Sequence, residues 1–103
     1  MSVRTIDEIL SPWVKRHGLR VSNIYRNHFY YVDIFDDAGG RYEISIFKDD
    51  QPDLIKVRVS SNRKRSCGFI GIGLSDLEGV LEQAYSRVIR WVEQAGGTRM
   101  LAP

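Results

Sequence analysis

HFYYVDIFDDAGGRYEISIF, residues 28–47, is the stretch of sequence that decides the fold. It holds two runs in which β-branched and aromatic residues alternate, and the turn-forming segment DDAGG, residues 36–40, separates them. Alternation with a period of two is typical of β-strands, and a short glycine-containing segment between two such runs is typical of a hairpin. The stretch therefore predicts a β-hairpin.

Alternation sends the side chains of this hairpin to two faces of different character. One face is expected to carry Tyr30, Val32, Ile34, Tyr42, Ile44 and Ile46. The other is expected to carry Phe29, Tyr31, Asp33, Phe35, Arg41, Glu43, Ser45 and Phe47. The second face has too many aromatic rings for ordinary solvent-exposed surface, so the question of function centres on it.

Two segments with apolar residues spaced by three and four are predicted to be helices. The first begins at about Ile6, after a capping-box pattern, and ends near His17, with Gly18 as its left-handed terminator. The second begins after Ser75, whose spacing to Glu78 is also that of a capping box, and ends before the glycines at 96 and 97.

Residues 19–26, 54–60 and 68–74 are predicted to form further strands, which gives four or five strands depending on whether the first of them exists. The expected fold class is α+β: an antiparallel sheet with an N-terminal and a C-terminal helix packed on one face. Residues 1–95 are expected to form one domain and residues 96–103 a flexible tail.

The composition is that of an ordinary globular domain, with 43% hydrophobic and 27% charged residues. The sequence shows no long apolar run and no basic segment followed by an apolar one, so neither a membrane span nor an export signal is predicted. Cys67, the single cysteine, has no partner for an internal disulfide. We therefore expect a cytoplasmic location.

Charge is segregated along the chain. Residues 33–53 hold seven acidic residues against two basic ones, whereas residues 54–74 hold five basic residues and no acidic one: Lys56, Arg58, Arg63, Lys64 and Arg65. If the two segments form neighbouring strands, one interpretation is cross-strand pairing of Asp33 or Glu43 with the cations of the other strand. The other interpretation is a bipolar surface, and for the loop cluster at 63–65 both stay open.

The helices are expected to cover the face that carries Val32, Ile34, Ile44, Ile46, Ile55, Val57, Val59, Ile70 and Ile72. By parity, the opposite face then presents aromatic rings and cations together: Phe29, Tyr31, Phe35, Phe47, Phe69, Arg41, Lys56 and Arg58. This mixture has three explanations: recognition of a protein, binding of single-stranded nucleic acid, or aromatic residues that merely cover the edges of the core.

Candidate catalytic and metal-binding groups do not combine into a site. His17 and His28 have no cysteine or carboxylate at the spacing of metal ligands, and His17 is expected to contact carbonyls at its helix end. Cys67 lies alone on a predicted strand, where a cysteine usually behaves as a small buried apolar residue. The glycine-rich run at 68–73 lacks the Lys-Ser/Thr ending of a phosphate-binding loop. We therefore expect no enzyme, no metal and no cofactor.

The sequence thus favours a small non-enzymatic binding module that contacts another protein, or a second copy of itself, through the uncovered face of the sheet. Inhibitors, immunity proteins, antitoxins and chaperone-like adaptors of this size all fit. The alternative is a single-stranded nucleic-acid-binding module that uses the same face together with Arg63, Lys64 and Arg65.

Overall fold

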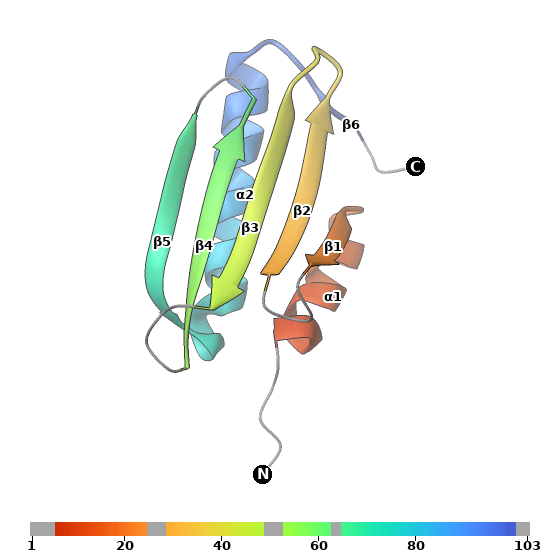
Figure 1. Cartoon of the computed structure of the whole chain (residues 1–103). Helices are drawn as coiled ribbons and strands as arrows, with labels where there is room; N and C mark the ends of the chain where they lie inside the picture. Colours follow the sequence, from red (N-terminus) through yellow and green to blue (C-terminus); the bar gives the residue numbers. More distant parts are fainter. Residues whose placement is uncertain (1–5, 25–28, 49–52, 63–64, 101–103) are drawn as a thin grey trace.

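The computed structural model describes residues 6–24, 29–48, 53–62 and 65–100. In chain order the elements are α1 (Ile6–Arg16), β1 (Arg20–Ile24), β2 (Phe29–Asp36), β3 (Arg41–Lys48), β4 (Leu54–Ser61), β5 (Ser66–Gly73), the short 3-10 helix η1 (Leu74–Asp76), α2 (Leu77–Gln94) and β6 (Arg99–Met100). Strands β1 to β5 form one antiparallel sheet in sequence order (Figure 1). The predicted α+β fold is confirmed, with five strands in this series.

The predicted hairpin is formed by β2 and β3, with Val32 opposite Ile44 in the ladder. Its turn is organised by the carboxylate of Asp36, which is only 2% exposed. This carboxylate accepts hydrogen bonds from the backbone N–H groups of Ala38 and Gly40, at 2.9 and 2.5 Å, and from the Tyr42 hydroxyl at 2.8 Å. A residue that the sequence marks only as a turn former therefore also ties the turn to a buried core tyrosine.

The two helices and one face of the sheet enclose a single core, and both helices lie behind the sheet in the view of Figure 1. Every hairpin residue predicted for the core face is at most 3% exposed. Trp13 of α1 and Leu81 of α2 are at most 1% exposed, so both helices contribute fully buried side chains. Burial, followed by the charge of Asp7 in the first turn of α1, raises the pKa of the core residue Tyr30.

The alternation predicted for β5 is wrong at Phe69 and Ile70, whereas Ile72 is buried as predicted. Val57 pairs with Phe69 and Ile55 pairs with Ile72, so Lys56 of β4 faces two residues of β5 across the ladder. The bulge contains Gly71, whose φ of +64° is a conformation that glycine adopts without strain. As a result Phe69 packs against the core, and Ile70, predicted for the core, is 79% exposed.

The start of α2 also differs from the prediction. The expected capping box at residues 75–78 is not formed, because η1 precedes the helix and Asp76 occupies the N-cap without a side-chain hydrogen bond. The capping pattern predicted for α1 includes Thr5, which lies outside the described residues. At the end of α1, Gly18 has the predicted left-handed conformation, with φ +64°, and the N–H of Leu19 bonds to the carbonyl of Val14 at 2.8 Å.

Residues 96–100 do not form the flexible tail that the sequence predicts. They turn back after α2 and add β6 to the outer edge of β2, with Arg99 opposite Asp36 in the ladder. The N–H of Thr98 bonds to the Asp37 carboxylate at 2.7 Å, and the Arg99 guanidinium donates to the carbonyl oxygens of His17 and Gly18. The C-terminal segment therefore joins the sheet to the end of α1.

Candidate interaction surface

The face of the sheet that the helices leave uncovered carries aromatic rings from two strands. Phe29 of β2 lies opposite Phe47 of β3, and their ring centroids are 5.7 Å apart. Tyr31 is opposite Ser45 in the next row. Ser45 is only 7% exposed although it lies on this face, between Tyr31 of β2 and Arg58 of β4. The three rings predicted for one end of this face are thus brought together.

Cations and one aliphatic side chain continue these rows onto the neighbouring strands. Phe47 is opposite Lys56 of β4, and Ser45 is opposite Arg58. The bulge places the exposed Ile70 of β5 beside Lys56. We name this surface the aromatic–basic band; it consists of Phe29, Tyr31, Phe47, Lys56, Arg58 and Ile70.

Not all of the predicted contact residues belong to this band. Phe35 and Arg41 lie opposite each other near the β2–β3 turn, with the guanidinium 5.9 Å from the ring centroid. The row that contains Asp33 and Glu43 separates them from the band. Phe69 was predicted to lie on the open face, and this prediction is wrong because the bulge turns its side chain to the helix side.

Ile70 was missed by sequence reasoning, which placed it in the core. The available signal was the glycine that follows it, since a glycine inside a strand marks a bulge or a close backbone approach. Residues 68–73 contain three glycines, so the sequence offered three possible positions for a bulge, and only Gly71 has a positive φ. The pairing of β5 with β4 determines which of these positions carries the bulge.

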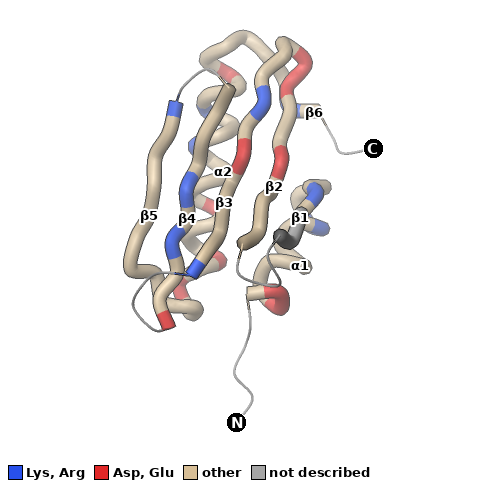
Figure 2. Tube along the Cα trace, viewed as in Figure 1, with Lys and Arg blue, Asp and Glu red and all other residues tan. Residues whose placement is uncertain are grey.

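The predicted pairing of Asp33 or Glu43 with Lys56 or Arg58 is wrong for the ladder as formed. Ser60, not a cation, lies opposite Glu43, and β3 separates Asp33 from β4. Glu43 instead accepts a hydrogen bond from the Ser45 hydroxyl at 3.1 Å, and the Arg58 side chain has no hydrogen bond or ion pair with any described residue. Figure 2 shows the result: two cations lie along β4, acidic residues lie on β2, and β3 carries one acidic residue between the cations at its two ends.

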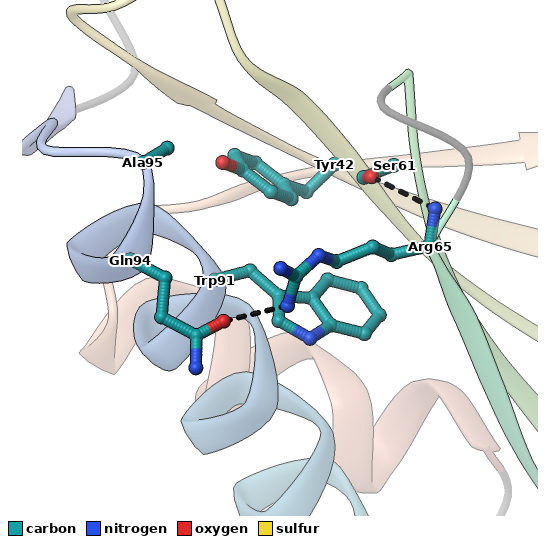
Figure 3. Close-up of a pocket in the computed structure, with 6 residues that line it drawn as sticks. All are labelled: Tyr42, Ser61, Arg65, Trp91, Gln94 and Ala95. Atoms are coloured by element: carbon teal, nitrogen blue, oxygen red, sulfur yellow. Dashed lines mark hydrogen bonds between the residues drawn. The ribbon is translucent and has the colours of Figure 1, made fainter.

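The side chain of Arg65, the one residue of the basic cluster at 63–65 that the structure describes, points away from the open face. Arg63 and Lys64 lie outside the described residues. The Arg65 guanidinium reaches over the Trp91 indole and donates to the side-chain oxygen of Gln94 in α2 at 2.6 Å (Figure 3). It closes one side of a pocket of about 270 Å³ between sheet and helix, lined by Tyr42, Ser61, Arg65, Trp91, Gln94 and Ala95.

A polar cluster joins the two helices on the other side of the molecule. The Glu82 carboxylate accepts hydrogen bonds from the Trp13 indole at 2.8 Å and bonds to the His17 ring at 2.9 Å. The bond with His17 is the main reason why the pKa of Glu82 is held below its ordinary value. His17 also contacts Tyr85, with ring centroids 4.3 Å apart. The predicted contact of His17 with helix carbonyls is therefore replaced by a contact between the helices.

Comparison of the chain with models of known families, with curated proteins and with solved structures finds no match. None of the described helices is long and apolar enough to cross a membrane. Within the described ranges, no three His, Cys, Asp or Glu side chains lie close enough together to hold a metal ion. The inference of function therefore rests on the surfaces of the chain itself.

Proposed function

We propose that this protein binds another protein through the aromatic–basic band. The observation that supports this most directly is the exposure of Ile70, at 79%, beside a cation and a pair of packed aromatic rings. Aromatic and arginine side chains are typical of the residues that dominate protein interfaces, and an exposed apolar side chain beside them adds area to bury. The band also lies on a regular sheet, so its backbone is in place before a partner arrives.

The chemistry of the band defines the partner. Phe47 and Ile70 favour an apolar surface on the partner, because contact with such a surface removes both side chains from water. The Arg58 side chain has no hydrogen bond or ion pair with a described residue, and Lys56 lies in the next row of the same face. A complementary partner therefore presents apolar side chains flanked by Asp or Glu.

Three features favour a protein over single-stranded nucleic acid. Phe29 and Phe47 pack against each other, whereas base stacking uses rings whose faces are open. Asp33 and Glu43 occupy the adjoining row of the same face and would repel phosphates. Arg65 is bonded to α2 and does not extend the band. The nucleic-acid alternative is nevertheless a distinct outcome of the experiment.

The test uses Arg58→Glu and Ile70→Asp, with Arg87→Glu as a matched control, because Arg87 is exposed on α2 and outside the band. Proteins captured from the native cell extract are identified, and the candidate is then purified and titrated. Both band variants are expected to weaken its affinity at least about tenfold, as loss of about 1.4 kcal/mol does. The control is expected to bind as wild type.

Equal affinity of all four proteins for the purified partner would contradict the proposal. A parallel titration with a labelled single-stranded oligonucleotide separates the two functions. If the band holds phosphates, binding falls steeply with salt and is lost in Arg58→Glu. That result, without any protein partner sensitive to Ile70→Asp, would replace the proposed function with the nucleic-acid one.

A further inference from the structure

The outer edge of β5 is the longest uncovered strand edge in the part of the chain that the structure describes. β5 has eight residues and pairs with β4 alone, whereas the outer edge of β2 is covered by β1 and β6. Natural proteins usually protect such an edge with charged residues or proline. The strand SCGFIGIG contains neither. Figure 1 shows no helix or strand beyond it.

The ladder with β4 determines which backbone groups of β5 point outward. The N–H of Ser61 donates to the carbonyl of Arg65 at 2.9 Å, so the groups of Arg65 point toward β4. Because these groups alternate along an antiparallel strand, Cys67 and Phe69 also bond inward, and Ser66, Gly68 and Ile70 point their N–H and C=O away from the sheet. The bulge at Gly71 ends this series.

These outward groups match an antiparallel copy of themselves. With Gly68 opposite Gly68 of the second copy, Ser66 lies opposite Ile70, and each such pair can exchange two hydrogen bonds. The centre of the contact has no side chain to hold the strands apart, and Ser66, Gly68 and Ile70 are all exposed. The two bulges then lie at the two ends of the contact, where pairing stops.

We propose that two copies of this chain pair through β5, antiparallel and with Gly68 on the two-fold axis, to form one continuous sheet. The strand has no charge, so the pairing brings no like charges together. On the helix side Cys67 of one copy faces Phe69 of the other, and both are only partly buried in the monomer. The contact is made by the backbone edge of β5 and shares only Ile70 with the aromatic–basic band, so it does not depend on the proposed function.

A disulfide trap tests the register. In a Cys67→Ser background, Gly68→Cys places two cysteines opposite each other with Cα atoms about 5.5 Å apart, which suits a disulfide. Ser66→Cys in the same background is the control, because the two copies of residue 66 are offset by four residues, roughly 13 Å. Mild oxidation is expected to cross-link most of the first variant and little of the second. Equal cross-linking of both variants, or of neither, would overturn the register.

A second pair of variants tests the backbone. Gly68→Pro removes an outward N–H and leaves the bonds to β4 in place, whereas Gly68→Ala keeps it, and its added Cβ meets only the Val57 carbonyl at 3.6 Å. Light scattering after size exclusion is expected to show dimers of wild type and Gly68→Ala, and a monomer of Gly68→Pro with unchanged circular dichroism. A wild-type monomer at about 1 mM, where even a 1 mM dissociation constant would be detected, overturns the proposal.

Arg58→Glu separates this dimer from association through the band. We expect this variant to form the same dimer as wild type, because Arg58 belongs to β4, one strand in from the edge that pairs, and its ladder partner Gly68 supplies only backbone groups to the contact. A dimer that is lost in Arg58→Glu and kept in Gly68→Pro would overturn the edge pairing and would assign self-association to the band.

Discussion

Glu82 of α2 accepts a hydrogen bond from the indole Nε1 of Trp13 in α1 at 2.8 Å, across 69 positions of sequence. The same oxygen bonds to the His17 ring, so one carboxylate holds Trp13 of α1 and His17, the residue that follows the helix, against α2. The apolar side chains of α1 account for the burial of the helix. The hydrogen bond from Trp13 to Glu82 ties the last turn of α1 to α2. Helix docking in this protein therefore includes a group that titrates.

Glu82→Gln is expected to remove an acid-dependent part of the stability. The folded protein holds the pKa of Glu82 below the ordinary value of 4.5, mainly through the bond with His17. The carboxylate therefore stabilises the fold above about pH 4.5, and this contribution is lost as the pH falls through the lowered pKa. Because the side chain is 45% exposed, we expect less than about 1 kcal/mol. Urea unfolding of both proteins at pH 7 and pH 3 measures it.

The expected result is a difference between wild type and Glu82→Gln at pH 7 that shrinks at pH 3. Glu93→Gln is the matched control, since Glu93 is exposed on the same helix and has no side-chain hydrogen bond or ion pair with a described residue. A constant difference at both pH values would show that the carboxylate contributes through packing alone.

Asp36→Ala is expected to lower the free energy of unfolding by about 2–4 kcal/mol. The change leaves the buried Tyr42 hydroxyl and two turn N–H groups without their acceptor, and buried polar groups without partners are costly. Tyr42→Phe removes only one of these bonds and is expected to cost about 1 kcal/mol. Chemical denaturation of the single and double variants gives the coupling energy, and strict additivity would contradict a shared network.

Gly71→Val is expected to destabilise the protein by about 1–2 kcal/mol through backbone strain alone. No atom lies within 4 Å of a Cβ added at this position, so crowding is not the cause, whereas a φ of +64° is unfavourable for a branched residue. Gly71→Asn is the control, because asparagine adopts this conformation more readily. Thermal unfolding of the three proteins should rank them as wild type, Asn, then Val.

Arg99→Ala is expected to destabilise the protein by about 1–2 kcal/mol, although the sequence places this residue in a tail. The guanidinium bonds to the carbonyls of His17 and Gly18 and lies 5.6 Å from the Tyr85 ring centroid. Met100→Ala is the control, since Met100 is half exposed. Equal unfolding midpoints of the two variants in urea would show that the C-terminal segment is not held by this arginine.

The elements of the fold could be predicted because each depends on a local pattern. Alternation from Tyr30 to Ile46 placed the hairpin and its buried face correctly, and Gly18 correctly ended α1. The bulge at Gly71 was not predictable in the same way, because residues 68–73 place apolar side chains on both faces of the strand. Which of these side chains face the core depends on how β5 pairs with β4.

The candidate surface was predicted in part for the same reason. Parity gave Phe29, Tyr31, Phe47, Lys56 and Arg58, which the structure brings together on one face. It could not give the direction of Arg65, which is decided by Gln94, 29 positions away in sequence. Nor could it show that Arg99 returns to the end of α1, since two residues of strand leave almost no periodic signal.

The way β1 and β6 both pair with β2 limits how far the sheet can grow. β1 and β6 together occupy the rim of that strand, so a copy docking there would find short, already paired segments. Pairing through β5 is isologous, because both molecules use the same strand edge. In the part of the chain that the structure describes, no second long strand edge is then left for a third molecule. A chain with an unguarded, uncharged strand is thereby expected to stop at a closed pair instead of lengthening into fibres.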